Sequence, residues 1–412
     1  MTNTYDATFL TDRTGLKEHD TANYGVNFLY RGNVTSSTRL GVSSSTNYDI
    51  TGMPVTNTSG ATVVAITPSN NNVVPATITP NSQSNLAITM SWTGFLGLSQ
   101  EVDPNGATTT LVYDSYARPQ QATSPHGAVT TFIYTNSPPT KKATTNNKWV
   151  KSTFDGLGRV IKTETGYSTT TVSIVDTEYD SCACSPGGKV TRVSQPRAPG
   201  GTVYWTTNTY DGLGRITSVA HPGGDGTTTY LYEGNTVKLT DPAGKWKKYT
   251  SDVFGNLTKV NEPRPGGGAD YETNYTYNLH DPLTQVSMPR PTGTQTRTFN
   301  YDLATGRLTS ATNPENGTVS YTYNSDGTIA TKTDAKGDRQ EWSYDTYKRV
   351  TQTRRFVNFG FGQFGEDACQ AVNYYYDTNP LDGSFTQNGW GRLTAAAWTG
   401  GRRPSHLAVP CT

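Results

Sequence analysis

Residues 210–216 of the chain read Tyr210-Asp211-Gly212-Leu213-Gly214-Arg215-Ile216 and contain a strong turn signal. The Asp211 carboxylate can accept backbone N–H bonds two residues on, and Gly214 can take a positive φ without steric cost, which favours a tight turn. Residues 203–209, rich in Thr and aromatic side chains, precede the turn, and the polar–apolar alternation of residues 215–219 follows it. Both runs are typical of β-strands. The stretch therefore predicts a β-hairpin.

The same frame recurs along the chain, and spacings of 22, 21 and 32 residues separate successive copies from position 301. The clearest copies begin at Tyr113-Asp114, Phe154-Asp155, Tyr301-Asp302 and Tyr344-Asp345. A second motif, Asp-Pro-x-Gly, alternates with the first at Asp103 and Asp241. A single hairpin is marginal in water, so the modules must stack on their neighbours. The pattern predicts one long antiparallel sheet that winds up because sheets twist.

The repeated turn residues are expected to serve structure, because repeated positions in such arrays usually stack against one another. Tyr would pack in a ladder, Asp would cap a turn, and Arg would pair locally. The positions concerned are Tyr113, Asp114, Phe154, Asp155, Gly158, Arg159, Tyr210, Asp211, Gly214, Arg215, Tyr301, Asp302, Gly306, Arg307, Tyr344 and Asp345.

Composition supports an all-β chain and narrows the function. Of 412 residues 33% are hydrophobic and 11% are aromatic, with 25 Tyr, whereas disordered chains are poor in aromatics. The net charge of +1 gives no basic footprint for nucleic acid. No apolar run approaches the roughly 20 residues that span a bilayer. The first residues show no basic and apolar segments typical of a signal peptide.

Tyr-Asp-x-x-Gly-Arg alternating with Asp-Pro-x-Gly resembles the YD repeat of the Rhs family. That family includes bacterial Rhs polymorphic toxins, the B/C component of insecticidal toxin complexes and animal teneurins. The resemblance implies a spiralling antiparallel β-hairpin array, a partial or open YD shell. It also implies a non-catalytic shell or scaffold segment of a toxin-encapsulating or cell-surface protein, secreted or displayed on the cell. Its partners would be the rest of a larger Rhs-type polypeptide or an encapsulated toxin segment.

The repeat pattern divides the chain into three parts. Residues 1–90 are read as divergent YD-like repeats, 91–400 as the YD-repeat shell segment and 401–412 as a tail outside the repeat. The core and toxin domain that follow the array in bacterial members are not recognisable here, so we expect an array fragment or a truncated member. Unpaired sheet edges in such an array invite self-association.

No constellation of catalytic, cofactor-binding or metal-binding residues emerges, and the chain is not expected to be an enzyme. An aspartic protease needs two carboxylates that share a proton, whereas the Asp-Pro residues Asp103, Asp241 and Asp281 belong to separate hairpins. A glycosidase would need two carboxylates about 5 to 9.5 Å apart in a cleft, and Glu101, Glu262 and Glu341 are the acids to test.

Two segments stand outside the repeat. Cys182-Ala183-Cys184 could begin a zinc site, but Cys369 and Cys411 are remote, so free thiols or one long-range disulfide are the favoured alternatives. Residues 356–365 form the most apolar insertion. Phe359, Phe361 and Phe364 could plug a lumen or dock a partner, or fold onto their own sheet.

The alternative function is a surface adhesion module for carbohydrate or protein. Ring faces of tryptophan can stack on sugars, although the rings could equally be buried in the ladder. The tryptophans available are Trp92, Trp149, Trp205, Trp246, Trp342, Trp390 and Trp398.

Overall fold

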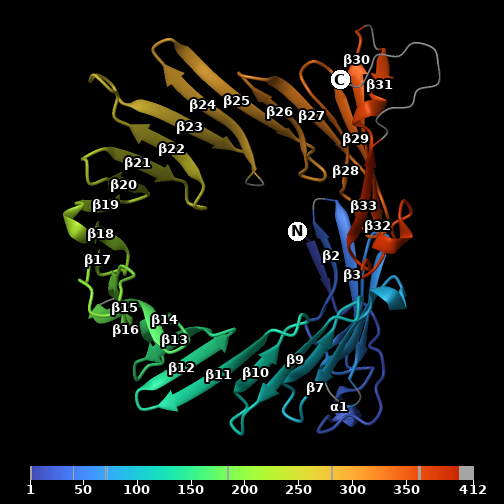
Figure 1. The fold of residues 1–412 in the computed structure, drawn as a ribbon. Helices are drawn as coiled ribbons and strands as arrows, with labels where there is room; N and C mark the ends of the chain where they lie inside the picture. The colour runs from blue at the N-terminus through green and yellow to red at the C-terminus, as the bar shows by residue number, and fades with distance from the viewer. Residues whose placement is uncertain are drawn as a thin grey trace. The chain divides into compact units, whose positions relative to one another are not determined.

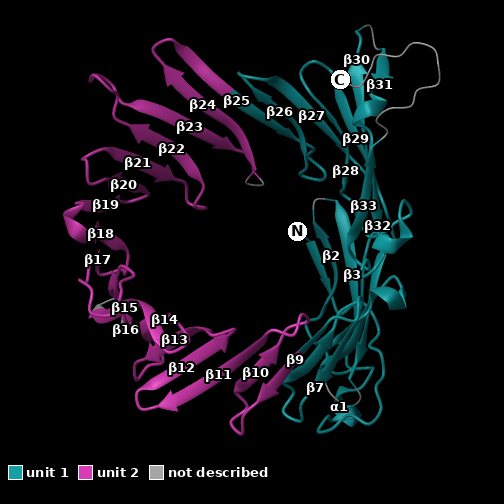
Figure 2. Ribbon diagram, viewed as in Figure 1, with its two compact units in different colours: residues 1–109, 297–412 teal, residues 110–296 magenta. Residues whose placement is uncertain are grey.

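The computed structural model describes residues 2–39, 41–69, 71, 73–182, 185–279, 282–360 and 363–398. In these residues the chain forms one 33-stranded antiparallel sheet (Figure 1). The only α-helix within them is the four-residue α1 (Thr21–Tyr24). The predicted all-β fold of antiparallel hairpins is confirmed. Two compact units divide the chain (Figure 2): unit 1 is Met1–Thr109 with Arg297–Thr412, and unit 2 is Thr110–Thr296.

Unit 1 combines the first and last strands of the chain. Its strands and 3₁₀ turns are β1 (Thr2–Tyr5), β2 (Val34–Arg39), β3 (Val42–Tyr48), β4 (Pro54–Ser59), β5 (Thr62–Pro68), β6 (Pro75–Pro80), η1 (Ser84–Leu86), β7 (Ile88–Trp92), β8 (Leu98–Val102), β26 (Leu308–Asn313), β27 (Gly317–Tyr323), β28 (Ile329–Thr333), β29 (Arg339–Tyr344), β30 (Val350–Asn358), β31 (Phe364–Glu366), η3 (Ala368–Gln370), β32 (Val372–Tyr376), η4 (Gly383–Phe385) and β33 (Leu393–Trp398).

Unit 2 holds the middle of the array, and β9 (Thr108–Tyr113) and β25 (Gly293–Tyr301) cross the two boundaries between the units. Its elements are β10 (Pro119–Thr123), β11 (Val129–Asn136), β12 (Pro139–Thr145), β13 (Lys148–Phe154), β14 (Val160–Tyr167), β15 (Thr170–Cys182), β16 (Ser185–Ser194), β17 (Trp205–Tyr210), β18 (Ile216–Ala220), η2 (Pro222–Gly224), β19 (Thr227–Glu233), β20 (Thr236–Thr240), β21 (Trp246–Ser251), β22 (Leu257–Glu262), β23 (Tyr271–Tyr277) and β24 (Leu283–Arg290).

Strands that pair are neighbours in the chain, apart from the additional pairing of β30 with β32. Successive turns therefore alternate between the two ends of the strands. Turns such as β13–β14 and β17–β18 carry the Tyr-Asp motif, and we call their side of a unit the Tyr-Asp edge. The turn β20–β21 carries an Asp-Pro motif, as does the turn after β8, and we call the opposite side the Asp-Pro edge.

A Tyr-Asp turn also disturbs the pairing in a regular way. The register of β17 with β18 shifts between Thr209 and Tyr210, and that of β13 with β14 shifts between Thr153 and Phe154. A β-bulge of this kind increases the local twist and re-aims the side chain next to it. The bulge therefore sets the direction in which each motif tyrosine leaves its strand.

The sheet has little fully buried interior, and most strand residues are half-buried. The largest fully buried side chains are Ile50 and Asp49, in the turn between β3 and β4. Leu10 and Met53 are also buried there, because the segment around α1 folds over this turn. Stability must therefore depend heavily on contacts from one hairpin to the next, as in other repeat proteins.

Candidate functional site: the tyrosine-aspartate turns

Each Tyr-Asp turn is organised by its aspartate, as the β13–β14 turn shows. Asp155 Oδ1 accepts hydrogen bonds from the backbone N–H groups of Leu157 and Arg159, both at 2.9 Å. The Asp155 N–H donates to the Arg159 carbonyl, and the Gly158 N–H donates to the Asp155 carbonyl. Gly158 has φ = 77°, a conformation that residues with a Cβ rarely adopt. Asp211 binds the Leu213 and Arg215 N–H groups in the same way.

The second carboxylate oxygen holds the motif arginine. Arg159 Nε donates to Asp155 Oδ2 at 2.7 Å. Together these bonds keep the pKa of Asp155 below its ordinary value, and the backbone N–H of Arg159 contributes most. The same pairing occurs for Arg118 with Asp114 at 2.8 Å, Arg215 with Asp211 at 2.7 Å and Arg349 with Asp345 at 2.6 Å.

The guanidinium fixed in this way reaches the next hairpin. The centre of the Arg159 guanidinium lies 4.3 Å from the centroid of the Tyr179 ring, on β15. The Tyr179 hydroxyl donates to the Val160 carbonyl, directly after the arginine, at 3.2 Å. We call this pair of contacts the interlock, because a turn of one hairpin holds the tyrosine of the following one. A cation over a ring and a neutral hydrogen bond each contribute roughly 1 kcal/mol.

The interlock repeats along both units. The complete examples, each given as arginine, tyrosine and carbonyl, are Arg118–Tyr134–Pro119, Arg159–Tyr179–Val160, Arg215–Tyr232–Ile216 and Arg307–Tyr323–Leu308. Where Asn256 replaces the arginine, the Tyr277 hydroxyl still donates to the Leu257 carbonyl at 2.9 Å. Burial raises the pKa of Tyr277, as it does for Tyr323 and Tyr344.

The remaining predicted turn residues occupy equivalent places. Each of the following ends the strand before its turn: Tyr113 on β9, Phe154 on β13, Tyr210 on β17, Tyr301 on β25 and Tyr344 on β29. The turn at Asp302 is one residue longer, and there Asp302 Oδ1 accepts from both the N–H and the hydroxyl of Thr305. Gly306 has φ = 69° in this turn.

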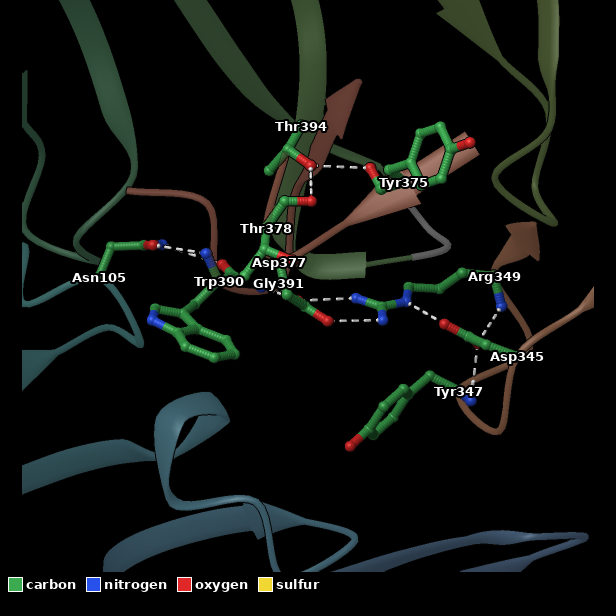
Figure 3. A network of polar contacts seen from close by, with 10 residues as sticks. All are labelled: Asn105, Asp345, Tyr347, Arg349, Tyr375, Asp377, Thr378, Trp390, Gly391 and Thr394. Atoms are coloured by element: carbon green, nitrogen blue, oxygen red, sulfur yellow. Dashed lines mark hydrogen bonds and ion pairs between the residues drawn. The ribbon is translucent and has the colours of Figure 1, made fainter. Parts of the chain in front are cut away.

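In unit 1 a bridged arginine joins two Tyr-Asp turns (Figure 3). Arg349 donates to Asp345 through Nε at 2.6 Å and to both carboxylate oxygens of Asp377, at 3.0 and 2.8 Å. Asp377 Oδ1 also accepts from the Gly391 N–H at 2.8 Å. Pairing with Arg349 holds the pKa of Asp377 below its usual range, so Asp377 is ionised at neutral pH. Three groups are thus locked in one network.

A second contact in unit 1 joins residues that are 285 positions apart (Figure 3). The Asn105 side chain accepts from the Trp390 N–H at 2.8 Å and donates to the Trp390 carbonyl at 3.0 Å, as a paired backbone would. Arg392 lies 3.4 Å from Asp103 in the same pair of turns. We call these contacts the Asn105–Trp390 clasp. Sequence reasoning missed it, because an Asn in a turn is unremarkable until its partner is known.

Arg13 is a further residue that the repeat pattern did not reveal. The early turn Tyr48-Asp49-Ile50-Thr51-Gly52 has no arginine at the motif position, and Arg13 Nη1 instead donates to Asp49 Oδ2 at 2.9 Å. Asp49 is fully buried, so an unpaired charge would be costly there. Arg13 thus takes the place of the motif arginine that this turn lacks. In the sequence, the missing motif arginine was the only sign that Asp49 needs a distant partner.

The two segments outside the repeat are placed only in part. Phe359, in the connection between β30 and β31, is 68% exposed and packs against Gly365, and Phe364, the first residue of β31, is 46% exposed. Phe361 lies outside the described residues, as do Cys184, Cys411 and the tail from 399 onward. The side chain of Cys182 is also not described, and Cys369 is disulfide-bonded. Across the described ranges no group of three or more His, Cys, Asp or Glu residues could hold a metal ion.

Four of the acids considered for catalysis, Asp103, Asp241, Glu262 and Glu341, are engaged in turns or ion pairs. Asp103 Oδ1 accepts from the Asn105 and Ala107 N–H groups, and Asp241 caps its own turn. Glu262 pairs with Lys247 at 2.7 Å. Glu341 lies 2.8 Å from an arginine on its own strand, and Asp281 falls outside the described part of the chain.

One family model and several solved structures are similar to parts of this chain. A family model described as RHS Repeat matches residues 301–339. No curated protein matches the chain. The crystal structure of TcdB2-TccC3 aligns with a TM-score of 0.69 at 14% identity, over 87% of this chain and 22% of that one. The crystal structure of TcdB2-TccC3-Cdc42 aligns with a TM-score of 0.67 at 13% identity, over 87% of this chain and 24% of that one. The chain thus spans less than a quarter of the length of either structure.

These findings confirm the resemblance that the Tyr-Asp turns suggested. The matched RHS repeat contains the Arg307–Tyr323 interlock, and the fold agrees with TcdB2-TccC3 over most of this chain. The region the structure describes holds no helix with the length and apolar character needed to cross a membrane. The repeat at residues 301–339 is therefore similar to the RHS repeat, and the fold of this chain is similar to that of TcdB2-TccC3.

Proposed function

We propose that this chain is a non-catalytic wall segment of an Rhs-type shell in a toxin-encapsulating or cell-surface protein. The observation that carries the proposal is the interlock, which uses the tyrosine, aspartate and arginine of the motif to join successive hairpins. A side chain occupied in this way is not available for chemistry on a substrate. The partner would be the rest of a larger Rhs-type polypeptide or an encapsulated toxin segment, outside the cell.

The strongest catalytic rival is the groove beside Arg349. Its volume is about 380 Å³, and its lining includes Asp345, Arg349 and Tyr376. A carboxylate pair acting as acid and base needs two different pKa values. Here Arg349 lies between Asp345 and Asp377, and it lowers the pKa of Asp377. An ionised Asp377 cannot donate a proton at neutral pH, which favours a structural role.

Activity and stability of the same variants test this proposal. Wild-type chain is expected to turn over no substrate in a panel of glycosides and peptides. Asp377→Asn, which removes one charge beside Arg349, is expected to lower the melting temperature without changing that result. A wild-type activity that Asp377→Asn or Asp345→Asn abolishes, with the circular dichroism spectrum retained, would overturn the proposal. Asp382→Asn, at the N-cap of η4, is the control for a nearby aspartate outside the Arg349 network.

A second function, glycan adhesion, is favoured by one groove in unit 2. Its volume is about 540 Å³, and it crosses β20, β21 and β22. Trp246 offers a ring, while Lys248, Asn261 and Asp270 offer hydrogen-bond donors and acceptors around it. Pockets that recognise small ligands combine apolar surface with a few placed polar groups in this manner. Lys238 Nζ lies 4.8 Å from the centroid of the Trp246 ring and contributes a positive charge.

Glycan-array binding separates the two functions. An adhesion module would bind defined glycans, and Trp246→Ala would remove that binding. Trp205→Ala is the control, because Trp205 is also half-buried on a strand of unit 2 and an arginine lies over its ring, but it does not line this groove. The absence of binding, or equal loss in both variants, would exclude the groove as the binding site.

A further inference from the structure

Unit 1 shows how the two turn edges of this repeat fit together. Its later Tyr-Asp turns contact the Asp-Pro edge formed by its earlier strands. The Thr62 hydroxyl, beside the β4–β5 turn, donates to the Thr346 carbonyl in the β29–β30 turn at 2.7 Å. The Asn105–Trp390 clasp joins the turn after β8 to the connection before β33. The Tyr-Asp edge and the Asp-Pro edge are therefore in contact within this unit.

Trp390 occupies a defined position of the motif. Trp390-Gly391-Arg392 corresponds to Leu157-Gly158-Arg159, because Asp377 N–H donates to the Arg392 carbonyl just as Asp155 N–H donates to that of Arg159. Trp390 lies at the tip of its turn, and its backbone meets Asn105. Tyr347 has the same place in the neighbouring turn. Both tips are half-buried where the edges touch.

The same tip position in unit 2 is exposed. Leu157 is 68% exposed, Leu213 76% and Phe254 80%, and Tyr116 is similarly open. Each of these apolar side chains is presented on the Tyr-Asp edge of its unit. The arginines next to them, Arg159 and Arg215, hold their own aspartates and remain partly exposed. This edge has the docking positions of unit 1 without a bound partner.

Unit 2 also exposes the complementary edge. In the β20–β21 turn, Asp241-Pro242-Ala243-Gly244 repeats the form of Asp103-Pro104-Asn105-Gly106, and residues 242–245 are exposed. Asp241 stands where Asp103 faces Arg392 in unit 1. Arg159 and Arg215 of another strip would supply the matching cation. One unit thus presents turns of both kinds, with Ala243 at the position where Asn105 binds Trp390 in unit 1.

We propose that the Tyr-Asp edge of unit 2 is a docking surface for the Asp-Pro edge of unit 2 in a second copy of this chain. The inference rests on the proposed wall function, because it extends edge-to-edge stacking of a wall from one strip to the next. Two different surfaces meet, so the contact is heterologous, and such a contact builds a ring if its rotation closes and an open filament if it does not. The tips Leu157, Leu213 and Phe254 supply the apolar contact.

Sedimentation velocity of the full chain between about 1 and 200 µM tests the docking. The wild-type chain is expected to form a concentration-dependent series of species. The variant Leu157→Asp, Leu213→Asp and Phe254→Asp is expected to weaken association by at least tenfold. A matched control changes three exposed apolar residues on the strands of the same unit, Ile133→Asp, Val172→Asp and Leu231→Asp, and is expected to associate as the wild type does.

Circular dichroism and melting temperatures of both triple variants must match the wild type, which is expected at positions this exposed. Cross-linking mass spectrometry of the wild type is expected to join residues near Leu213 to residues near Ala243. A wild-type monomer at every concentration would overturn the docking. The docking would also be overturned if the edge variant associated as strongly as the wild type, because the contact would then lie at unpaired strands and not at the turn tips. Neither result bears on the wall function, which is tested separately by the activity and stability of the Asp345 and Asp377 variants.

Discussion

At the scale of the residue, the two carboxylate oxygens of each motif aspartate bind different groups. Asp211 Oδ1 caps its turn while Asp211 Oδ2 orients Arg215, whose guanidinium lies over Tyr232. The aspartate thereby converts a local turn into a contact with the next hairpin. A glutamate could not reach both the turn N–H groups and the arginine with the same geometry, since its side chain is one methylene longer.

Removing one hydroxyl from the interlock gives a measurable loss. Tyr232→Phe deletes the 3.0 Å bond to the Ile216 carbonyl and leaves the ring beneath Arg215. We expect unfolding in urea to show a destabilisation of about 1 kcal/mol. Tyr230→Phe, on the same strand, is the control, because its hydroxyl has no hydrogen-bond partner in the described residues. Equal losses in both variants would count against the interlock.

Acid should weaken the turns in a defined pH window. Backbone and arginine hydrogen bonds lower the pKa of Asp155 and Asp211. A carboxyl whose pKa is lower in the folded chain than in the unfolded chain stabilises the fold at pH values above the unfolded pKa, which is about 3.9 for Asp. That stabilisation is lost as the pH falls through the folded pKa. The melting temperature should stay level from pH 7 to about 5 and fall below about pH 4.

The variant Asp211→Asn isolates one turn in that experiment. It cannot form the charged pair with Arg215, so its melting temperature at pH 7 should lie below that of the wild type. The difference should shrink below about pH 4, where the wild-type carboxylate also becomes protonated. A difference that is the same at pH 7 and pH 3 would show that ionisation of Asp211 contributes nothing.

At the scale of the element, the hairpins β13–β14 and β14–β15 show close packing in a thin sheet. Trp149 on β13 is buried and faces Gly166 on β14, and its indole N–H donates to the Ser168 carbonyl at 2.9 Å. A Cβ at Gly166 would overlap both the Trp149 ring and the Thr170 carbonyl oxygen. The absent side chain is what lets the ring lie flat on the neighbouring strand.

Gly166→Ala should therefore destabilise the chain by about 1–3 kcal/mol, as overpacking in other proteins does. Gly156→Ala is the matched control, because a Cβ there would meet no atom within 4 Å and its φ is not positive. Thermal unfolding compares the melting temperatures of the two variants. Equal melting temperatures for Gly166→Ala and wild type would mean that the ring and glycine are not in contact.

The elements also show what could be predicted from the sequence. The hairpin around residues 210–216 follows from local turn chemistry and alternation, because both act within a few residues. The partner of Arg215 could not be predicted, since it depends on the register of β19, which carries Tyr232 17 residues later. The Asn105–Trp390 clasp and the Arg13–Asp49 pair need tertiary structure to be seen at all.

At the scale of the whole molecule, periodicity carried the prediction. Repeated Tyr-Asp turns predicted an all-β chain and a resemblance to the Rhs/YD repeat, and both are confirmed. The division into units at 109/110 and 296/297 has no counterpart in the sequence, because β9 and β25 continue across it without a change of motif. The proposed boundaries at 90/91 and 400/401 remain predictions.

The central claim is that each hairpin is held mainly by its neighbours through the interlock. Hydrogen-exchange mass spectrometry of the full chain, wild type against Tyr232→Ala, tests it most directly. We expect faster exchange in β17–β20, weaker effects in the hairpins on either side, and no change in β26–β28. Exchange that rises only at β19, or equally throughout the chain, would contradict it.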